Sequence, residues 1–575
     1  MSILELKAGG IINNRPQKVW EIREQIFKDE LTQILYNRGI VSSDCKNEII
    51  DNFLHPSFEN DLHDPKLLPD YQIFEDRISS AITNKEKIGI FADYDADGIP
   101  GAAFLHRAFK ILGIQSQTYI PLRENGYGFN KEGIDILLDG GCSLIISVDL
   151  GIKEFKNAEY IKSKNCDLII TDHHLPDDEL PTALAVINPK IKNSRYPFKE
   201  LSGAGVVFKL IQGLSNKYPK KIGQSFLKWN LDLIAISTIS DVVPMVGENR
   251  VISKFGLISL SKTKNIGLRA LYDICGIDKS KITSYEIGFM IAPRINAPGR
   301  IDHATKSLEL LITEDKKEAL ELSRWLNEKN QLRQSAMEQV EIEAIKKIEK
   351  YNITKNKIII LHGDWPKGVI GPSASRLVEK YSRPVVLLAR DEEGFSGSCR
   401  SISNFNIIEA LQKVEKYLDA FGGHKGAAGL HLKVKNLEKF TEKLNQVANT
   451  SISQEDLCPK IFIDLVVSPN NCNFSLCRRI QLLEPFGVGN SKPIIMIKNI
   501  KIEKYRTVGQ TDKHLKIIFN TGTKPMDSIL FNYDKDRINL EIGRSYDIVF
   551  YPEINYWNGR ESISLKLMDI KPNEK

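Results

Sequence analysis

The chain has 575 residues, of which 42% are hydrophobic and 26% charged, and its formal net charge is +6. This length calls for several domains, and the mild charge means that nucleic-acid binding would need local clusters of Lys and Arg. The eight cysteines show no metal-ligand or disulfide spacing, the N-terminal residues lack the apolar core of a signal peptide, and no apolar run reaches the roughly 18 residues of a membrane span. We therefore expect a cytoplasmic protein.

Taken in chain order, the pattern predicts an α/β unit, a long helix, a second α/β unit and a small β-barrel. Apolar runs alternate with helical patterns from about Lys87 to Pro244, which favours a parallel sheet. Residues 315–350 contain neither Gly nor Pro and predict a helix that joins two domains. Short β-like runs after Pro459 are typical of an OB-fold. The expected segments are 1–70, which packs on the catalytic core, 71–310, 311–352, 353–450 and 455–575.

Acidic and histidine residues follow four of the apolar runs. Asp93, Asp95 and Asp97 alternate after the first, and their side chains would project to one side if the extended conformation continued. The other runs end at Asp149, at Asp172-His173-His174 and at Asp241. Because the carboxyl ends of parallel strands meet at one edge of a sheet, we expect one rim of carboxylates and imidazoles. Such a ligand set suits divalent cations.

Other interpretations of these residues are possible when each is taken alone. The first acidic stretch also matches the start of an EF-hand loop, but Phe104 stands where that loop needs its twelfth-position Glu, and the preceding segment reads as a strand. An isolated Asp149 more often caps a helix, and neighbouring histidines are more often structural than metal-binding. The convergence of all four segments favours metal.

These residues resemble the motifs of the DHH phosphoesterase superfamily, and within it the bacterial exonucleases specific for single-stranded DNA. The four motifs are "DYDADG", "SVDLG", "TDHH" and "STISDVVP". Five further segments agree in order: "APRINAPGRIDHA", "KGVIGPSASRLVEKYSRPVVLL", "GSCRSI", "FGGHKGAAG" and "LEPFGVGN". The resemblance implies a DHH-type parallel-sheet domain (71–310), a connecting helix (311–352), a DHH-associated α/β domain (353–450) and a C-terminal OB-fold (455–575).

The resemblance also implies two Mn²⁺ or Mg²⁺ ions and stepwise 5′-to-3′ release of 5′-mononucleotides in DNA repair and recombination. Asp95 would serve one ion and Asp97 the other, with Asp149 bridging them. His173 and Asp241 would complete the second ion's ligands, and Asp93 would bind the first ion or support its ligands. Asp172 would orient its neighbours, and His174 would face the scissile phosphate. The catalytic residues are thus expected to be His174, Asp172 and Asp149.

Substrate-binding residues are expected in both halves of the chain. In the family, positions matching Arg123, Arg300, Ser398 and Arg400 bind the terminal 5′-phosphate, and Arg294 lies in the same motif as Arg300. The glycine-rich loop with Gly423, His424 and Lys425 would contact DNA near the scissile phosphate. Tyr127 and Phe129 are candidates for base stacking or for the core, and Lys and Arg around Tyr505 would line a path for single strands on the barrel.

Two departures from the family pattern stand out. Pro366 follows Trp365 where a His is usual, which removes one expected contact near the nucleic acid. Pro100 stands where the helix usually starts with Ser or Thr, and Pro is well tolerated in a first turn.

Two other functions compete with this interpretation. A DHH phosphoesterase acting on oligoribonucleotides or cyclic dinucleotides is the nearest alternative, although such relatives are usually shorter and lack the barrel. A scaffold protein with a decayed site is disfavoured because every metal ligand is present. The expected partners are single-stranded DNA with a 5′ end and, from the resemblance alone, a single-strand-binding protein and a RecQ-type helicase. We expect a monomer that does not bind membranes.

Overall fold

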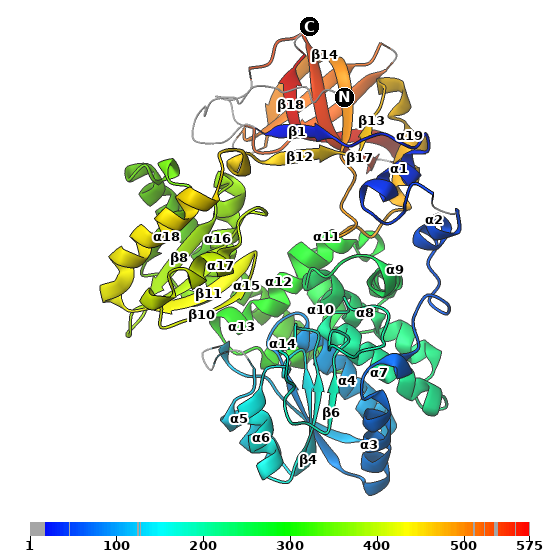
Figure 1. The fold of residues 1–575 in the computed structure, drawn as a ribbon. Helices are drawn as coiled ribbons and strands as arrows, with labels where there is room; N and C mark the ends of the chain where they lie inside the picture. The colour runs from blue at the N-terminus through cyan, green and yellow to red at the C-terminus, as the bar shows by residue number, and fades with distance from the viewer. Residues whose placement is uncertain are drawn as a thin grey trace. The chain divides into compact units, whose positions relative to one another are not determined.

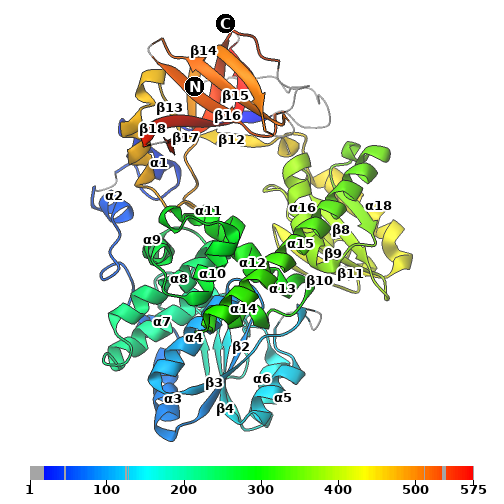
Figure 2. The same cartoon turned by 180° about the vertical axis from the view of Figure 1, so that it is seen from behind.

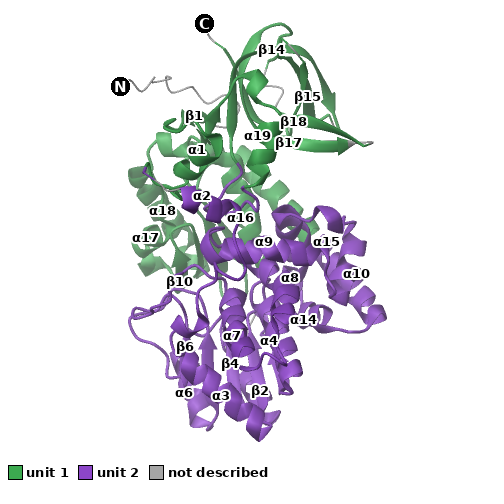
Figure 3. Cartoon of the chain, turned by 90° about the vertical axis from the view of Figure 1, so that its right-hand side faces the viewer, with its two compact units in different colours: residues 1–43, 333–482, 493–575 green, residues 44–332, 483–492 purple. Residues whose placement is uncertain are grey.

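The computed structural model describes residues 18–44, 47–123, 126, 128–509, 512–522, 524–533, 539–557 and 559–573. The chain divides into two compact units (Figure 3). Unit 2 comprises residues 44–332 and 483–492, and unit 1 comprises residues 1–43, 333–482 and 493–575. Among the described helices, none combines the length and the apolar character that crossing a membrane would require.

A five-stranded parallel sheet forms the centre of unit 2. Its strand order is β3-β2-β4-β5-β6, and every neighbouring pair is parallel. Figure 2 shows β2, β3 and β4 from behind. The strands are β2 (Lys87–Ala92), β3 (Gln115–Tyr119), β4 (Cys142–Val148), β5 (Asp167–Thr171) and β6 (Ala185–Ile187).

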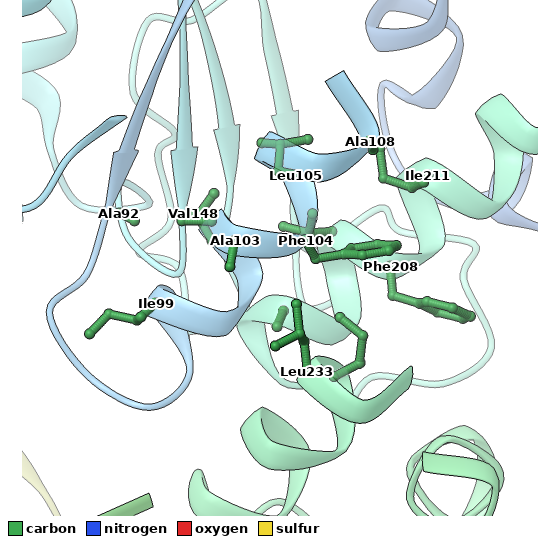
Figure 4. Close-up of a cluster of buried hydrophobic side chains, with 14 of the residues drawn as sticks. Ala92, Ile99, Ala103, Phe104, Leu105, Ala108, Val148, Phe208, Ile211 and Leu233 are labelled. Carbon is green, nitrogen blue, oxygen red and sulfur yellow. The ribbon is translucent and has the colours of Figure 1, made fainter. Parts of the chain in front are cut away.

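Hydrophobic side chains cover both faces of this sheet. Along β2, Ile88 and Ile90 join the core on one face, and Phe91 joins the core on the other, as strand alternation requires. In Figure 4, Phe104 packs beside Phe208 on the first face. Helices α4 (Gly98–Leu112) and α7 (Gly203–Lys217) lie on that face, and α5 (Lys131–Asp139) and α6 (Phe155–Ser163) lie on the other (Figure 1).

The remaining helices of unit 2 extend the core on the α4 and α7 side, with hydrophobic residues from several of them in the same cluster. They are α2 (Asn47–Leu54), α3 (Tyr71–Asn84), α8 (Gln224–Ser240), α9 (Gly247–Ser261), α10 (Ile266–Cys275), α11 (Ser284–Glu286), the π-helix η4 (Ile287–Ile291), α12 (Ala292–Asn296), α13 (Pro298–Ile301) and α14 (Thr305–Ile312).

The long helix expected between the domains is α15 (Lys316–Lys350), which begins in unit 2 and ends in unit 1. Unit 1 then builds a second five-stranded sheet in the order β10-β11-β9-β8-β7, in which only the β7–β8 pair is parallel. Its elements are β7 (Ile359–Gly363), α16 (Lys367–Tyr381), β8 (Val385–Arg390), β9 (Phe395–Arg400), α17 (Ile407–Gln412), β10 (Ala420–His424), β11 (Ala427–Leu432) and α18 (Leu437–Ser451).

A closed barrel follows in the same unit. Strand β14 pairs with β15 on one side and with β17 on the other, so that β14, β15, β16, β18 and β17 complete a circle. The elements are β12 (Lys460–Ile463), β13 (Leu465–Val466), α19 (Phe474–Gln481), β14 (Ile495–Val508), β15 (His514–Asn520), β16 (Pro525–Leu530), β17 (Ser545–Trp557) and β18 (Arg560–Pro572). The expected fold class, with two α/β parts joined by a long helix and an OB-type barrel, is confirmed.

The N-terminal segment is divided between the two units, whereas we expected residues 1–70 to pack on the catalytic core. Strand β1 (Val19–Ile22) runs parallel to β12, and α1 (Glu30–Asn37) lies in unit 1 with it. Trp20 donates a hydrogen bond to Asp569 (3.0 Å), and Arg479 forms ion pairs with Asp29 and Glu30. Within the first 70 residues, only the described ones from Asp44 onward belong with the parallel sheet.

Candidate metal centre

The acidic loop after β2 turns at once into α4. It does not continue the extended conformation under which Asp93, Asp95 and Asp97 would alternate on one side, because Asp95 Oδ1 accepts the backbone N–H groups of Asp97 (2.8 Å) and Gly98 (3.1 Å). The carboxylate thus satisfies amide groups at the start of the helix. A Cβ at Gly98 would lie 2.5 Å from the carbonyl oxygen of Asp93, so this turn requires glycine.

Asp97 is held by the N-terminus of α7. Its carboxylate accepts the N–H groups of Gly203 and Ala204, each at 2.7 Å, and the hydroxyl of Ser237 at 2.6 Å. The positive end of the α7 dipole therefore faces this buried carboxylate. Three donors fix the side chain in one orientation, so its position at the rim is set before any cation binds.

Asp149 directly follows β4 in the left-handed region, with φ of 64°. Asp and Asn tolerate this region better than other side chains. A Cβ at Gly203 would lie 2.6 Å from the Cβ of Asp149, so glycine is what lets α7 approach so closely. The side chain of Asp149 is only 3% exposed, and it lies in the middle of the rim.

His173 presents one particular ring nitrogen to the carboxylates. Its Nδ1 lies 2.9 Å from the carbonyl oxygen of Leu201, which can only accept, so Nδ1 carries the proton. Its Nε2 lies 3.3 Å from Asp149 Oδ1, 3.5 Å from Asp241 Oδ2 and 3.7 Å from Asp97 Oδ2. This is the arrangement of a metal-ligating histidine oriented by a backbone carbonyl.

Asp172 and His174 form a second arrangement beside it. Asp172 Oδ1 lies 2.8 Å from His174 Nδ1 and accepts the N–H groups of His173 and His174, and its Oδ2 accepts the N–H of Ile152. The side chain of Asp172 is buried, whereas that of His174 is 45% exposed. Asp172 therefore orients its neighbours, and His174 is the histidine of the pair that a substrate can reach.

Asp241 reaches the rim from a helix, which corrects the expectation that all four apolar runs end there as strands. The run before it is the interior of α8, and Asp241 is its C-cap. Apolar character alone does not separate a buried strand from a buried helix, but the 17 residues of α8 are long for a strand. The side chain of Asp241 is 27% exposed.

The electrostatics of the rim call for a cation. Burial and the neighbouring aspartates raise the pKa of Asp93, Asp95 and Asp149, and the same causes raise the pKa of Asp241 to about 9. Burial lowers the pKa of His173, which keeps its Nε2 lone pair available. Such shifts are costly for carboxylates unless a positive charge compensates them.

The residues fit divalent cations. Within the described part of the chain, Asp93 Oδ1 and His173 Nε2 are buried and meet no hydrogen-bond partner. Ligand atoms within 4.8 Å of one another occur in three groups. The groups are Asp93 with Asp95 and Asp149, Asp97 with His173 and Asp241, and Asp149 with His173 and His174. Asp149 thus belongs to two of these groups, one with Asp93 and Asp95 and one with His173 and His174.

Arginines lie close to the acidic loop in unit 2. The Arg123 guanidinium is 5.5 Å from the ring centre of Tyr94. The positive charge of Arg300 is also near enough to favour the ionised form of the Tyr94 phenol. The guanidinium of Arg294 is engaged elsewhere. It donates to Asn327 (3.0 Å) and to the carbonyl of Met290 (2.6 Å), which gives it a bracing role between α12 and α15.

The other predicted substrate residues lie in unit 1. Ser398 and Arg400 are neighbours on β9, with Arg400 Nη1 donating to Ser398 Oγ at 3.2 Å. His424 and Lys425 are exposed at the turn between β10 and β11, and Gly423 before them has φ of 144°. The structure therefore brings the metal-binding candidates together in unit 2 and these five residues together in unit 1.

Some residues that shape the rim were not singled out from the sequence. Ser237 bonds to Asp97, Asn188 donates to the carbonyl of His174 (2.8 Å), and Asn296 accepts from the N–H of Ala96 (2.7 Å). Ser237 and Asn296 lie inside motifs quoted above, whereas Asn188 follows β6 and lies in none of them, so no signal in the sequence pointed to it. Phe129 is a core residue, 4.8 Å from Phe91 between ring centres, and Tyr127 lies outside the described residues.

The two departures from the family pattern lie at helix starts. Pro100 is in the first turn of α4, and Pro366 is the N-cap of α16. Trp365 before it is buried and donates to Glu343 at 2.7 Å.

Comparison with known proteins agrees with this geometry. The chain matches the N-terminal domain of the DHH family over residues 87–238, the DHHA1 domain over 354–450 and the RecJ OB domain over 463–569. It is 35% identical to the single-stranded-DNA-specific exonuclease RecJ of Bacillus subtilis, over 96% of this chain and 71% of that protein. It is 30% identical to the RecJ of Escherichia coli, over 86% of this chain and 89% of that protein.

Solved structures agree as well. The crystal structure of RecJ from Thermus thermophilus in complex with Mn²⁺ matches with a TM-score of 0.80 at 26% identity, over 97% of this chain and 80% of that one. The Mg²⁺ complex of the same protein matches with a TM-score of 0.75 at 25% identity, over 97% of this chain and 79% of that one. The chain therefore belongs to the RecJ family of DHH phosphoesterases.

Proposed function

We propose that this chain is a metal-dependent exonuclease that degrades single-stranded DNA from its 5′ end and releases 5′-mononucleotides, in DNA repair and recombination. The observation that carries the proposal is the pair of ligand groups on either side of Asp149, set on a fold whose relatives are named as single-strand-specific exonucleases. Seven cysteines among the described residues are free thiols, which suits a reducing, cytoplasmic setting.

The rim supplies places for two cations. Asp93, Asp95 and Asp149 would hold one, and Asp97, His173 and Asp241 would hold the other. Asp149 would be shared, because its Oδ1 lies 3.3 Å from His173 Nε2. When bound, two divalent cations polarise the phosphate, lower the pKa of a water and stabilise the charge on the attacking and leaving oxygens.

The protein's own groups supply orientation and proton handling. His174, held through Nδ1 by Asp172, would place Nε2 against the scissile phosphate and stabilise its charge or assist proton transfer. Arg123, Arg300, Ser398 and Arg400 match the family's positions for the 5′-phosphate and would bind it, because guanidinium groups pair with two phosphate oxygens at once. Gly423, His424 and Lys425 would contact the DNA backbone.

The barrel would bind the strand beyond the site, as OB-folds do with single strands. Lys504 and Arg506 flank Tyr505 on β14, and Tyr505 is 40% exposed. Action as a monomer, and cooperation with a single-strand-binding protein and a RecQ-type helicase, belong to the same proposal and rest on the resemblance alone.

The test is degradation of a single-stranded oligonucleotide in Mn²⁺, labelled at the 3′ end in one sample and at the 5′ end in another. We expect a ladder of shortened 3′-labelled products, immediate release of a labelled mononucleotide from the 5′-labelled strand, and an intact blunt duplex. A ladder from the 5′-labelled strand would overturn the polarity. Hydrolysis of dinucleotides without attack on long strands would identify a DHH phosphoesterase for oligoribonucleotides or cyclic dinucleotides instead.

A further inference from the structure

An exposed pair of aromatic rings lies on the helical segment that leads to the metal rim. Tyr285 and Phe289 are 60% and 68% exposed, and their rings stack with 4.8 Å between centroids and 28° between planes. Aromatic side chains of this size bury a large apolar surface when they pack in a core. Two of them, left in water side by side, form a flat apolar surface that other rings can cover.

The position of the pair connects it to the metal rim. The segment from Ser284 to Asn296 is continuously helical through α11, η4 and α12, and Figures 1 and 2 label α11 and α12 at its two ends. Asn296 at its end accepts the N–H of Ala96 in the acidic loop. Phe289 precedes Asn296 by seven residues, about two turns and about 10 Å along the axis. A bound polymer that left the rim along this helix would therefore meet the two rings.

The local backbone is typical of a functional surface. The rings sit at the junction of α11 and a π-helical turn, an insertion that is frequent at functional sites. Lys279 and Lys281 are exposed just before the helix, whereas Glu286 is engaged with Thr283 in a capping box. Lys281 also lies 3.8 Å from the exposed Asp278, so the lysines and acids of residues 278–286 balance, and the rings rather than the charge mark this surface.

We propose that Tyr285 and Phe289 form a stacking platform for the bases of single-stranded DNA next to the metal rim. This inference rests on the proposed function, because it places the same substrate a few nucleotides from the site of cleavage. Stacking tolerates any base, because every base has a π-face, so the platform would hold the strand without reading its sequence. Phe129, the other aromatic candidate among the described residues, is buried and does not compete for this role.

The test compares the affinity of wild type and the double variant Tyr285→Ala/Phe289→Ala for a fluorescent oligothymidylate, by anisotropy in EDTA so that no cleavage occurs. An abasic strand of equal length is measured beside it. Base stacking is worth about 1–3 kcal/mol per base on alanine substitution, so we expect Kd for oligothymidylate to rise about 5- to 150-fold. Kd for the abasic strand should stay the same in both proteins.

Three controls make the result decisive. The first is Tyr351→Ala, which removes an aromatic ring that is 63% exposed just after α15. This variant should bind oligothymidylate with the Kd of wild type. Tyr285→Trp and Phe289→Trp should keep the affinity, whereas Leu at either position should lose it. Stabilisation of the double variant by Mn²⁺ would show that the rim is folded.

An unchanged Kd for oligothymidylate, or full affinity with Leu, would overturn the platform. A drop in melting temperature with unchanged DNA affinity would also overturn it, because the rings would then be covered by protein. Failure of the wild type to degrade single strands, with the affinity difference intact, would reject the proposed function and leave the platform standing.

Discussion

Nδ1 of His174 lies 2.8 Å from Oδ1 of Asp172, a buried carboxylate that also accepts three backbone N–H groups. Burial alone would lower the pKa of His174, but the bond to Asp172 and its charge outweigh burial and raise that pKa. Burial opposes the charge on Asp172, yet the same bond lowers its pKa. The contact therefore favours the charged form of each side chain, and the histidine ring is its exposed end.

The first prediction concerns this pair. In metal-free protein, Asp172→Asn should lower the pKa of His174, because the compensating charge is gone while burial remains. The stability contributed by the pair should be full below the ordinary histidine pKa of about 6.5 and lost as pH rises through the higher folded value. NMR titration of the ring protons measures the pKa. An unchanged value in the variant would contradict the account.

The kcat for DNA degradation should depend on the orientation that Asp172 gives to His174. Removing a group that orients a ligand typically costs about 10- to 100-fold, so kcat of Asp172→Asn should fall by that factor. Asp177 is the matched control, since it is exposed and pairs only with Lys153 among the described contacts (2.8 Å). Asp177→Asn should keep kcat, and an equal loss in both variants would show that orientation is not the cause.

The second prediction concerns the charge on Asp149. Burial and four neighbouring aspartates raise its pKa, so metal-free wild type should lose stability as pH rises from about 4, the ordinary Asp pKa, through the higher folded value. Asp149→Asn removes this charge and keeps a side chain that tolerates positive φ. The variant should melt higher than wild type in EDTA at neutral pH and gain little from Mn²⁺.

Asp232 provides the matched comparison for that melting experiment. It is equally buried, but its carboxylate accepts from Thr263 (2.6 Å) and from the N–H of Leu233 (2.8 Å). Asp232→Asn should lower the melting temperature in EDTA and in Mn²⁺ alike. A lower melting temperature for Asp149→Asn in EDTA would argue that the rim is not under electrostatic strain.

The third prediction concerns a buried ion pair that ties the segment before α3 to the parallel-sheet unit. Lys209 and Glu248 are fully buried, with 2.9 Å between Nζ and Oε1, and Lys209 also donates to the carbonyl of His63 (2.6 Å). Lys209→Met should cost about 3–5 kcal/mol in urea denaturation, because Glu248 is left buried and uncompensated. The double variant with Glu248→Gln should recover part of that loss. A cost below about 1 kcal/mol for the single change would be inconsistent with an uncompensated charge.

The fourth prediction concerns the proposed 5′-phosphate residues of unit 1. A Cβ at Gly371 on α16 would lie 3.1 Å from both Arg400 Nη2 and Ser398 Oγ, so alanine there must displace one of them. Gly371→Ala should raise KM for a 5′-phosphorylated strand and leave KM for a 5′-hydroxyl strand unchanged. Equal changes for both strands would mean that these residues do not select the phosphate.

Much of the site followed from local patterns, because each ligand lies beside a recognisable apolar run. Asp149 and the Asp172–His174 stretch follow buried strands as expected. Asp241 illustrates the limit, since apolar residues buried all round read alike in a strand and in α8. The contact of Asp97 with the N-terminus of α7 joins residues more than a hundred positions apart, and no local pattern encodes such a contact.

Exposure was the other property that the sequence did not reveal. Phe129 and Phe289 both stand near glycine in segments of mixed polarity, yet one is 6% and the other 68% exposed. Tertiary packing decides this difference, because Phe129 meets Phe91 on the covered face of the sheet and Phe289 meets only Tyr285 among the described rings.

The most direct measurement of the central claim is electron paramagnetic resonance of the protein titrated with Mn²⁺. Two ions that share Asp149 should bind per chain and give a spin-coupled signal, since ions in such centres lie about 4 Å apart. Asp149→Asn should lose the coupling, whereas Asp232→Asn should keep it. A single uncoupled ion in wild type, or coupling that survives in Asp149→Asn, would contradict a two-cation centre built around this residue.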